Sequence, residues 1–340
     1  MEHLHPNRIA FSFVQGTFDI DRMKPVLWEV EEDTASAHVQ LDARWERLLP
    51  ALSNVGVLMA CATSGPATVA VALDSAFFEP VPNSADWVCL ESGMEICPAN
   101  LGGIIAAIEG LEGGQETASL QFFDRNGDGC LKLMATNRTD IAAFEALVRR
   151  HAGGRHTAHF GTPVTPSSPG EGTTPDARTV RSLWDGLRRT LPETSFPGLE
   201  GVSRRRALAV AGPEHAWQVR TTSVHSLMRV MTLADAPLGV GLRNEAVFLP
   251  VGMYPSHWND CACGTTFFST AAQVTLRHLI HQSETWVTRF IVKSREVLCL
   301  ELYDKQGRFC AGVGLRPEAT HAQQEQWNDW LHRAEEGASG

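Results

Sequence analysis

The stretch "SLQFFDRNGDGCLKL", from Ser119 to Leu133, decides how the chain is organised. Its run "LQFF" favours a β-strand, "DRNGDG" has the composition of a turn, and "CLKL" resumes an alternating strand, which together predict a β-hairpin. The turn also opens like a calcium-binding loop, which must close with a bidentate glutamate at its twelfth position. Counted from Asp124, that position is Ala135. The hairpin is therefore the favoured interpretation and calcium the minor one.

The hairpin recurs near the other end of the chain. The stretch "CLELYDKQGRFCAGV", from Cys299 to Val313, aligns with it without a gap, and Asp304 falls opposite Asp124. A helix-and-strand block before each hairpin and an amphipathic helix after it repeat in the same order. These further blocks pair Trp45–Val71 with Val224–Pro250, and Ala142–Arg150 with Glu325–Arg333. Three blocks in one order at a nearly constant offset indicate that a whole domain is duplicated.

The order of elements predicts the fold class. Each copy has its strands gathered in a run and helices at the ends, so we expect an α+β fold. We predict two fused structural repeats, each an antiparallel β-sheet with flanking helices. The N-terminal repeat is placed at residues 1–155 and the C-terminal repeat at residues 181–335. Residues 156–180 are rich in Gly, Pro, Ser and Thr, which is typical of a linker.

Composition narrows the class of protein. The 340 residues suffice for roughly two domains, and 43% are hydrophobic, which is ordinary for a globular core. No apolar run reaches the ~20 residues that span a membrane, and the N-terminus lacks the pattern of a secretory signal. The net charge of -10 argues against nucleic-acid binding, which needs a basic surface. We therefore expect a cytoplasmic protein without a membrane span.

Metal-binding patterns are weak. The eight cysteines are scattered, and Cys261 with Cys263 forms a C-x-C motif without the second pair that a zinc site needs. His151, His156 and His159 lie close together at the start of the linker. A flexible loop lacks the surrounding groups that orient metal-binding histidines, so ordinary surface residues are the favoured interpretation of these three.

Several stretches resemble the bacterial haem-utilisation proteins of the HemS/ChuS type. Both hairpins, each followed by a helix, resemble the conserved hairpin and helix of that family. Residues 286–327 resemble its C-terminal end, with a W-V-x-R strand, an "LELYD" hairpin and a final helix that bears a tryptophan. "APLGVGLRNEAVFLPVG", at residues 236–252, resembles another family strand. The resemblance covers about Trp45 to Arg333. It implies haem trafficking linked to haem uptake and iron utilisation, with haem between the central helices and the sheet of the C-terminal copy.

The chain departs from this family where haem chemistry would be expected. In the family a helical histidine ligates the iron and arginines meet the propionates. Here the ligand position falls on Leu191, followed by Pro192, which disfavours helix just before it. No Lys or Arg occurs from Leu48 to Asp124, so the distal arginine of the N-terminal copy is also missing. The W-V-x-R-K strand keeps Arg289 but has Phe290 in place of the lysine.

Some residues of such a site are present. Arg204 and Arg316 match family arginines, Arg204 near the propionates, although each could instead form a surface ion pair of little energetic worth. His215 and His225 are the candidates nearest in sequence to replace the missing iron ligand. The repeat alignment puts His225 on the helix equivalent to "WERLLPAL", which favours a partly buried or surface residue. Histidines left open between ligand and surface residue are His257, His278 and His281.

Three functions compete at this point. The first is a haem-binding or haem-trafficking protein that uses a substitute ligand or none. The second is a divergent HemS-like module that has lost haem ligation and serves as a binding or interaction protein. The third is a haem-degrading enzyme, which ranks lowest because oxygen activation needs a ligated iron and a polar distal pocket. Haem, or another small ligand in a cleft of the C-terminal repeat, is the expected partner.

Overall fold

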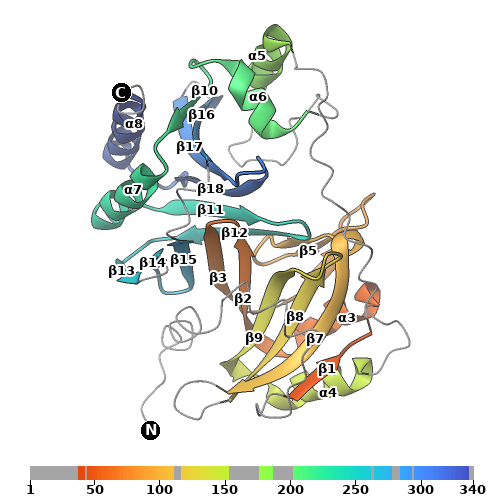
Figure 1. The fold of residues 1–340 in the computed structure, drawn as a ribbon. Helices are drawn as coiled ribbons and strands as arrows, with labels where there is room; N and C mark the ends of the chain where they lie inside the picture. Colours follow the sequence, from red (N-terminus) through yellow and green to blue (C-terminus); the bar gives the residue numbers. More distant parts are fainter. Residues whose placement is uncertain are drawn as a thin grey trace. The chain divides into compact units, whose positions relative to one another are not determined.

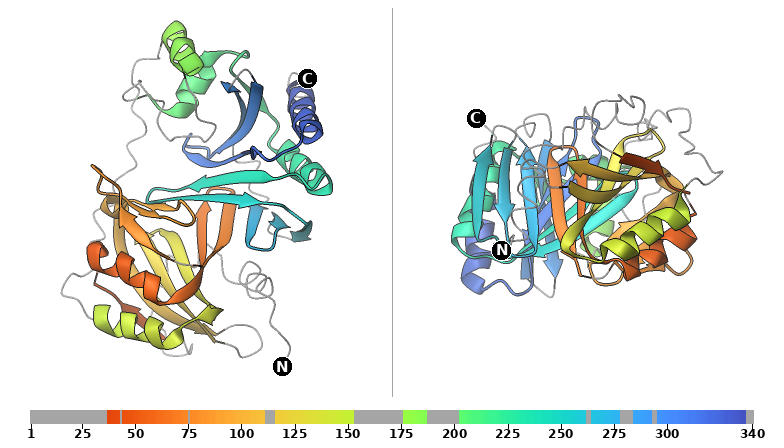
Figure 2. Two further views of the ribbon diagram at one scale, coloured as in Figure 1. Left: turned by 180° about the vertical axis from the view of Figure 1, so that it is seen from behind. Right: turned by 90° about the horizontal axis from the view of Figure 1, so that it is seen from below.

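Two antiparallel β-sheets flanked by helices form the protein (Figures 1 and 2). The computed structural model describes residues 37–42, 44–74, 76–110, 116–152, 176–186, 202–261, 264–277, 284–292 and 295–336. The predicted α+β class with antiparallel sheets is confirmed. Across these residues, no helix combines the length and the apolar character that crossing a membrane requires.

The first nine-stranded sheet contains the hairpin predicted around Asp124. Its strand order is β1-β7-β8-β9-β2-β3-β15-β14-β13. In that order the strands are β1 (Ala37–Gln40), β7 (Leu101–Gly110), β8 (Glu116–Asp124), β9 (Gly129–Thr139), β2 (Gly56–Ser64), β3 (Ala67–Leu73), β15 (Ala272–Arg277), β14 (Gly264–Phe268) and β13 (His257–Cys261). Leu120 of β8 pairs with Leu133 of β9, so the predicted hairpin is confirmed.

The second nine-stranded sheet repeats this arrangement, in the order β10-β16-β17-β18-β11-β12-β6-β5-β4. In that order the strands are β10 (Ala216–Val219), β16 (Glu284–Val292), β17 (Arg295–Tyr303), β18 (Phe309–Leu315), β11 (Leu238–Arg243), β12 (Val247–Met253), β6 (Glu95–Ile96), β5 (Trp87–Cys89) and β4 (Phe78–Pro80). Leu300 of β17 pairs with Val313 of β18, the same register as Leu120 with Leu133. The matching strand order and register confirm the internal duplication.

The helices follow the same duplication. The helical elements are α3 (Trp45–Ala51), η2 (Leu52–Asn54), η3 (Pro98–Asn100), α4 (Ile141–His151), α5 (Ala177–Gly186), α6 (Arg204–Ala211), α7 (Thr222–Leu233) and α8 (His321–Glu336). Helix α3 contacts α4 in the first half of the chain, and α7 contacts α8 in the second (Figure 1). Helix α7 thus corresponds to α3, as the repeat alignment predicted. Helices α5 and α6 also contact each other and precede the strands of the second half.

The two hairpin turns are built alike. Asp124 and Asp304 each use the side-chain Oδ1 to accept hydrogen bonds from the backbone amides two and four residues further on, at 2.8–2.9 Å. Gly127 and Gly307 have φ values of 82° and 76°, which glycine adopts without steric cost. The residues that resemble a calcium loop therefore close a turn. In the part of the chain that the structure describes, no group of three or more His, Cys, Asp or Glu could hold a metal ion.

Two compact units divide the chain, and each takes a short segment from the other half of the sequence. One unit comprises Met1–Thr63, Ala70–Val164 and Asn244–Leu249, and the other comprises Ser64–Val69, Thr165–Arg243 and Pro250–Gly340. Asn244 fixes one such segment, because its side-chain amide donates to the carbonyl oxygens of Thr63 and Cys130 at 3.2 and 2.7 Å. The predicted linker at 156–180 lies outside the described residues up to residue 175, so the repeat boundaries stay a prediction.

Candidate functional site

Helices α5 and α6 pack against β10, β16 and β17 and form with them a cluster that we call the α5–α6 corner. Trp184 of α5 stacks on Phe290 of β16, with ring centroids 5.5 Å apart and planes 15° from parallel. The indole nitrogen of Trp184 also donates to the carbonyl oxygen of Arg289, at 2.8 Å. The buried members of the cluster are Val180, Trp184, Ala207, Leu208, Ala211, Ala216, Trp286, Phe290, Cys299, Tyr303 and Phe309.

A buried ion pair lies in this corner. Helix α6 begins after Ser203, whose hydroxyl accepts a hydrogen bond from the amide of Arg206, so Arg204 occupies the first helical position. The guanidinium of Arg204 donates through Nε and Nη2 to both carboxylate oxygens of Glu301 in β17, at 2.8 and 2.7 Å. The two side chains are 3% and 0% exposed. Tyr303 donates its hydroxyl to the same carboxylate.

Burial and the Arg204–Glu301 pair shift the pKa values of the ionisable side chains in the corner. Burial by itself lowers the pKa of Arg204, but the charge and hydrogen bonds of Glu301 outweigh it and raise that pKa. Burial, and then the Glu301 carboxylate, raise the pKa of Tyr303 well above its usual value and that of Cys299 to about 12. Tyr303 and Cys299 therefore stay protonated at neutral pH, and the charge of Glu301 is balanced by Arg204.

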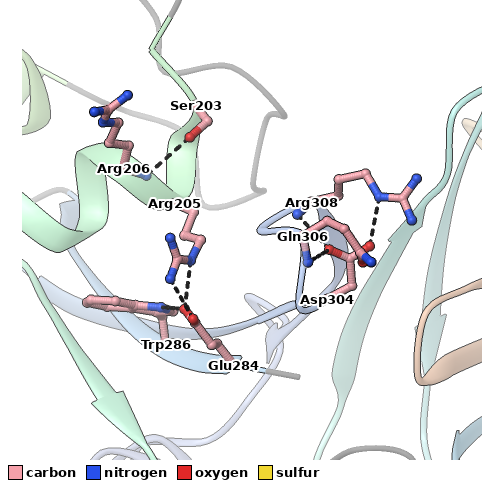
Figure 3. A network of polar contacts seen from close by, with 8 residues as sticks. All are labelled: Ser203, Arg205, Arg206, Glu284, Trp286, Asp304, Gln306 and Arg308. Carbon is pink, nitrogen blue, oxygen red and sulfur yellow. Dashed lines mark hydrogen bonds and ion pairs between the residues drawn. The ribbon is translucent and has the colours of Figure 1, made fainter. Parts of the chain in front are cut away.

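A second arginine–glutamate pair joins the next residue of α6 to β16 (Figure 3). Arg205 donates through Nε and Nη2 to the two carboxylate oxygens of Glu284 in β16, at 2.7 and 2.5 Å. These side chains are 41% and 33% exposed. The hydrogen bond from Arg205 is the main reason that the pKa of Glu284 is lowered. The indole nitrogen of Trp286 also donates to Glu284, at 3.4 Å.

His215 faces the same corner from the loop after α6. Its Nε2 lies 3.1 Å from a carboxylate oxygen of Asp185, and its ring meets Trp184 edge-on at a centroid distance of 6.0 Å. Its Nδ1 is buried and has no hydrogen-bond partner among the residues described. A neutral imidazole that donates Nε2–H to a carboxylate carries its lone pair on Nδ1. His215 thus has the orienting carboxylate and the unpaired nitrogen that metal-binding histidines commonly show.

His225 lies in a different network, formed by α7, β13 and β14. Its Nδ1 lies 3.1 Å from the hydroxyl of Thr265, which donates to Asp260 at 2.6 Å. Asp260 also accepts from Arg229 at 2.6 Å. His225 is partly buried, which agrees with the expectation from the repeat alignment. The structure therefore brings His215, but not His225, together with Arg204 around Trp184.

The sequence is similar to that of two curated proteins. No family model matches the chain. Two curated hemin transport proteins match in sequence, HmuS of Yersinia pestis, 26% identical over 218 residues, and HemS of Yersinia enterocolitica, 26% identical over 220 residues. Each match spans 63% of this chain and 62% of the relative's length. In sequence the chain is thus similar, at low identity, to hemin transport proteins of the HemS type.

Solved structures of HemS/ChuS-type proteins share the fold. Holo-PhuS, a heme-binding protein from Pseudomonas aeruginosa, superposes with a TM-score of 0.75 at 19% identity, covering 86% of this chain and 85% of PhuS. ChuS, a heme-degrading enzyme of Escherichia coli O157:H7, gives a TM-score of 0.73 at 20% identity, covering 87% and 86%. The two-repeat arrangement inferred from the hairpins is therefore that of the HemS/ChuS-type fold.

Two further arginines singled out by the HemS/ChuS resemblance form partly exposed ion pairs. Arg289 in β16 has its Nε 2.7 Å from a carboxylate oxygen of Glu296, and Arg316 after β18 donates to Glu318 at 2.8 Å. Arg316 lies against Gly252, where an added Cβ would come within 2.6 Å of its Nη1. The surface-pair interpretation therefore describes Arg316 as it stands, whereas it is wrong for Arg204, whose pair with Glu301 is buried.

The other sequence candidates are scattered or undescribed. His151 is buried at the end of α4, where burial, and then Arg150, lower its pKa. His257 is exposed and stacks on Phe268 of β14 at 4.8 Å. Positions that fall outside the described residues are His156, His159, Leu191, Pro192, Cys263, His278 and His281.

Sequence reasoning missed the two residues that define the corner's polarity, Glu301 and Asp185. One signal for Glu301 was available. It interrupts the otherwise apolar strand "VLCLELY", and a carboxylate within such a strand needs a cation or hydrogen-bond donors. No comparable signal marks Asp185, which is one of several polar residues on α5.

Proposed function

We propose that the protein binds haem through its C-terminal repeat and carries it within the cytoplasm, in support of haem uptake and iron utilisation. The sequence similarity to two hemin transport proteins supports this proposal, as does the fold shared with holo-PhuS. Within the chain, the observation that carries it is His215, whose buried Nδ1 has no hydrogen-bond partner in the described part and whose Nε2 is held by Asp185.

Haem requires a ligand for its iron and cationic donors for its propionates, and the α5–α6 corner offers a candidate for the first in His215. The iron of haem would accept a nitrogen ligand, which His215 would provide while Asp185 holds the orientation of the imidazole. The propionates require cationic donors. Arg204 is the arginine that the family resemblance assigns to them, and its guanidinium already donates to Glu301. Arg316 is partly exposed beside Glu318 and would be the accessible donor.

The structure also favours a second candidate, a HemS-like module that has lost haem and acts in binding or interaction. The polar and aromatic groups of the α5–α6 corner contact one another. Arg204 pairs with Glu301, and Trp184 stacks on Phe290. In a corner filled in this way, these polar and aromatic groups have protein partners in place of a ligand. We do not propose haem degradation, because the sequence has no Lys or Arg from Leu48 to Asp124 to supply the distal arginine.

Titration of the purified apoprotein with haemin tests the proposal. Binding is expected to shift the Soret band with saturation at one haemin per chain, and His215→Ala should change the ligand signature of that spectrum. Carriage is tested separately by mixing the loaded protein with apomyoglobin and following the appearance of holomyoglobin. A spectrum that remains that of free haemin, without saturation, would instead support the second candidate.

A further inference from the structure

We infer that Glu301 acts as an internal carboxylate that occupies Arg204, so that a carboxylate of a bound ligand reaches this arginine only by displacing Glu301. This inference rests on the proposed haem-binding function and deepens it. It makes Glu301 the residue that sets how strongly the C-terminal repeat holds a ligand bearing carboxylates.

The geometry of the pair is the first support. Nε and Nη2 lie on one edge of a guanidinium, and this edge is one with which arginine binds a carboxylate in two parallel hydrogen bonds. In Arg204 both of these nitrogens donate to Glu301, at 2.8 and 2.7 Å. A propionate that approached Arg204 along this edge would need the positions now held by the two oxygens of Glu301.

The surroundings of Glu301 make its displacement costly. Its side chain is 0% exposed, and Tyr303 donates a further hydrogen bond to it. A carboxylate that loses its cation while it stays buried is destabilised, because neither water nor another charge replaces the partner. The ligand's gain at Arg204 is therefore reduced by the cost of releasing Glu301.

The first repeat shows that the acid is not required by the fold. The gapless alignment of the hairpins puts Gln121 of β8 at the position of Glu301 in β17. Gln121 is 5% exposed, so a neutral amide of nearly the same size is accommodated in the equivalent buried place. The negative charge at residue 301 is thus specific to the repeat that contains Arg204 and His215.

The neighbouring pair offers a matched control. Arg205 follows Arg204 on α6, and Glu284 holds it with the same two-bond geometry (Figure 3). This pair is 41% and 33% exposed, so neutralising Glu284 leaves Arg205 in contact with water. Glu284→Gln therefore removes the carboxylate from an ion pair that joins the same helix to the same sheet, without releasing a buried arginine.

The test compares wild type, Glu301→Gln and Glu284→Gln in titrations with haemin, which has two free carboxylates, and with haemin dimethyl ester, which has none. Glu301→Gln is expected to bind haemin at least tenfold more tightly than wild type, about 1.4 kcal/mol. The affinity for the dimethyl ester should stay within about twofold of wild type in this variant. Glu284→Gln should leave both affinities unchanged.

A folding control keeps the result decisive. Circular dichroism and thermal unfolding establish that each variant is folded before titration. Should Glu301→Gln not fold, Glu301→Asp replaces it, because its shorter carboxylate cannot keep both contacts to Arg204 and should give a smaller gain in the same direction. If wild type binds haemin saturably and neither residue-301 variant binds it more tightly, the inference about Glu301 is overturned and the haem function stands. If no variant binds haemin saturably, both fail.

Discussion

Arg204, the first residue of α6, and Glu301, near the end of β17, form a two-bond ion pair with side chains 3% and 0% exposed. Glu301→Ala removes one partner and leaves the other charge buried without compensation. We expect the free energy of unfolding to fall by about 3–5 kcal/mol, measured by urea denaturation. The half-exposed partner in the neighbouring pair gives the control, and Glu284→Ala should cost about 0–1 kcal/mol. Equal losses in the two variants would contradict the burial argument.

His215 is expected to be the residue that would hold the iron of haem. His215→Ala should abolish a histidine-type haemin spectrum, because the nitrogen that would donate to iron is then absent. Asp185→Asn should weaken haemin binding by roughly tenfold or more, since it removes the carboxylate that orients the ring. His225→Ala is the control, because that ring is bonded to Thr265 in a different network. Loss of the spectrum in His225→Ala alone would reassign the ligand.

Gly102 in β7 is expected to tolerate no side chain. A Cβ there would lie 2.5 Å from the carbonyl oxygen of Asp124 and 3.1 Å from the Cα of Arg125, both backbone atoms of the hairpin. Gly102→Ala should therefore destabilise the protein by about 1–3 kcal/mol in denaturant titrations, as overpacking does. Gly239→Ala in β11 serves for comparison, since its nearest neighbour is a side-chain carbon of Arg316 at 3.6 Å. Similar losses of stability at both glycines would show that the backbone at Asp124 and Arg125 moves to accommodate the added Cβ, and would contradict the prediction.

Truncation of the Asn244 side chain is expected to lower the stability of the protein. Its amide nitrogen donates to two backbone carbonyls, and its carbonyl oxygen accepts from the amides of Ala246 and Val247. Asn244→Ala removes these four hydrogen bonds, with an expected loss of about 1–3 kcal/mol in the free energy of unfolding. Asn54→Ala removes one exposed hydrogen bond of 3.4 Å and should change stability by less than about 0.5 kcal/mol. A loss below that value at Asn244 would contradict the role given to its amide.

The buried thiol of Cys310 predicts a loss of stability at alkaline pH. Burial, and then the charge of Asp304, raise the pKa of this thiol from 9.0 to about 11. Because the folded form holds its proton more tightly, the stabilisation is complete below about pH 9 and declines as pH rises towards 11. Between pH 8 and pH 11 the free energy of unfolding should therefore fall by about 2 kcal/mol less in Cys310→Ala than in wild type. Parallel curves for variant and wild type would refute the assignment.

The duplication and the hairpins were predictable because patterns of neighbouring residues in the sequence indicate them. Turn residues around Asp124 and Asp304 lie between alternating strands, and the two stretches align without a gap. The remaining strand pairings were not predictable in this way. Strand β4, Phe78–Pro80, is only three residues long, and β6 pairs with β12 across a long stretch of sequence. Such pairings are decided by tertiary packing, which no local pattern records.

The candidate site shows the same division. The family resemblance identified Arg204, but its partner Glu301 lies 97 residues away in the sequence. The repeat alignment already favoured a partly buried or surface residue at His225, whereas His215 stayed open between ligand and surface residue. The structure gives each its partner, Asp185 for His215 and Thr265 for His225. These partners are brought close by the packing of helices and strands, so spacing along the chain could not predict them.

The exchange of Ser64–Val69 and Asn244–Leu249 between the two units has a consequence for any attempt to divide the gene. A polypeptide that stops at Val164 contains the first unit without the segment that Asn244 anchors, and the complementary fragment lacks Ser64–Val69. Each fragment on its own exposes a strand edge that the intact chain covers. Co-expressed, the fragments carry each other's missing segment. We therefore expect neither fragment to reach the stability of the intact chain on its own, which circular dichroism and thermal unfolding of each fragment would measure.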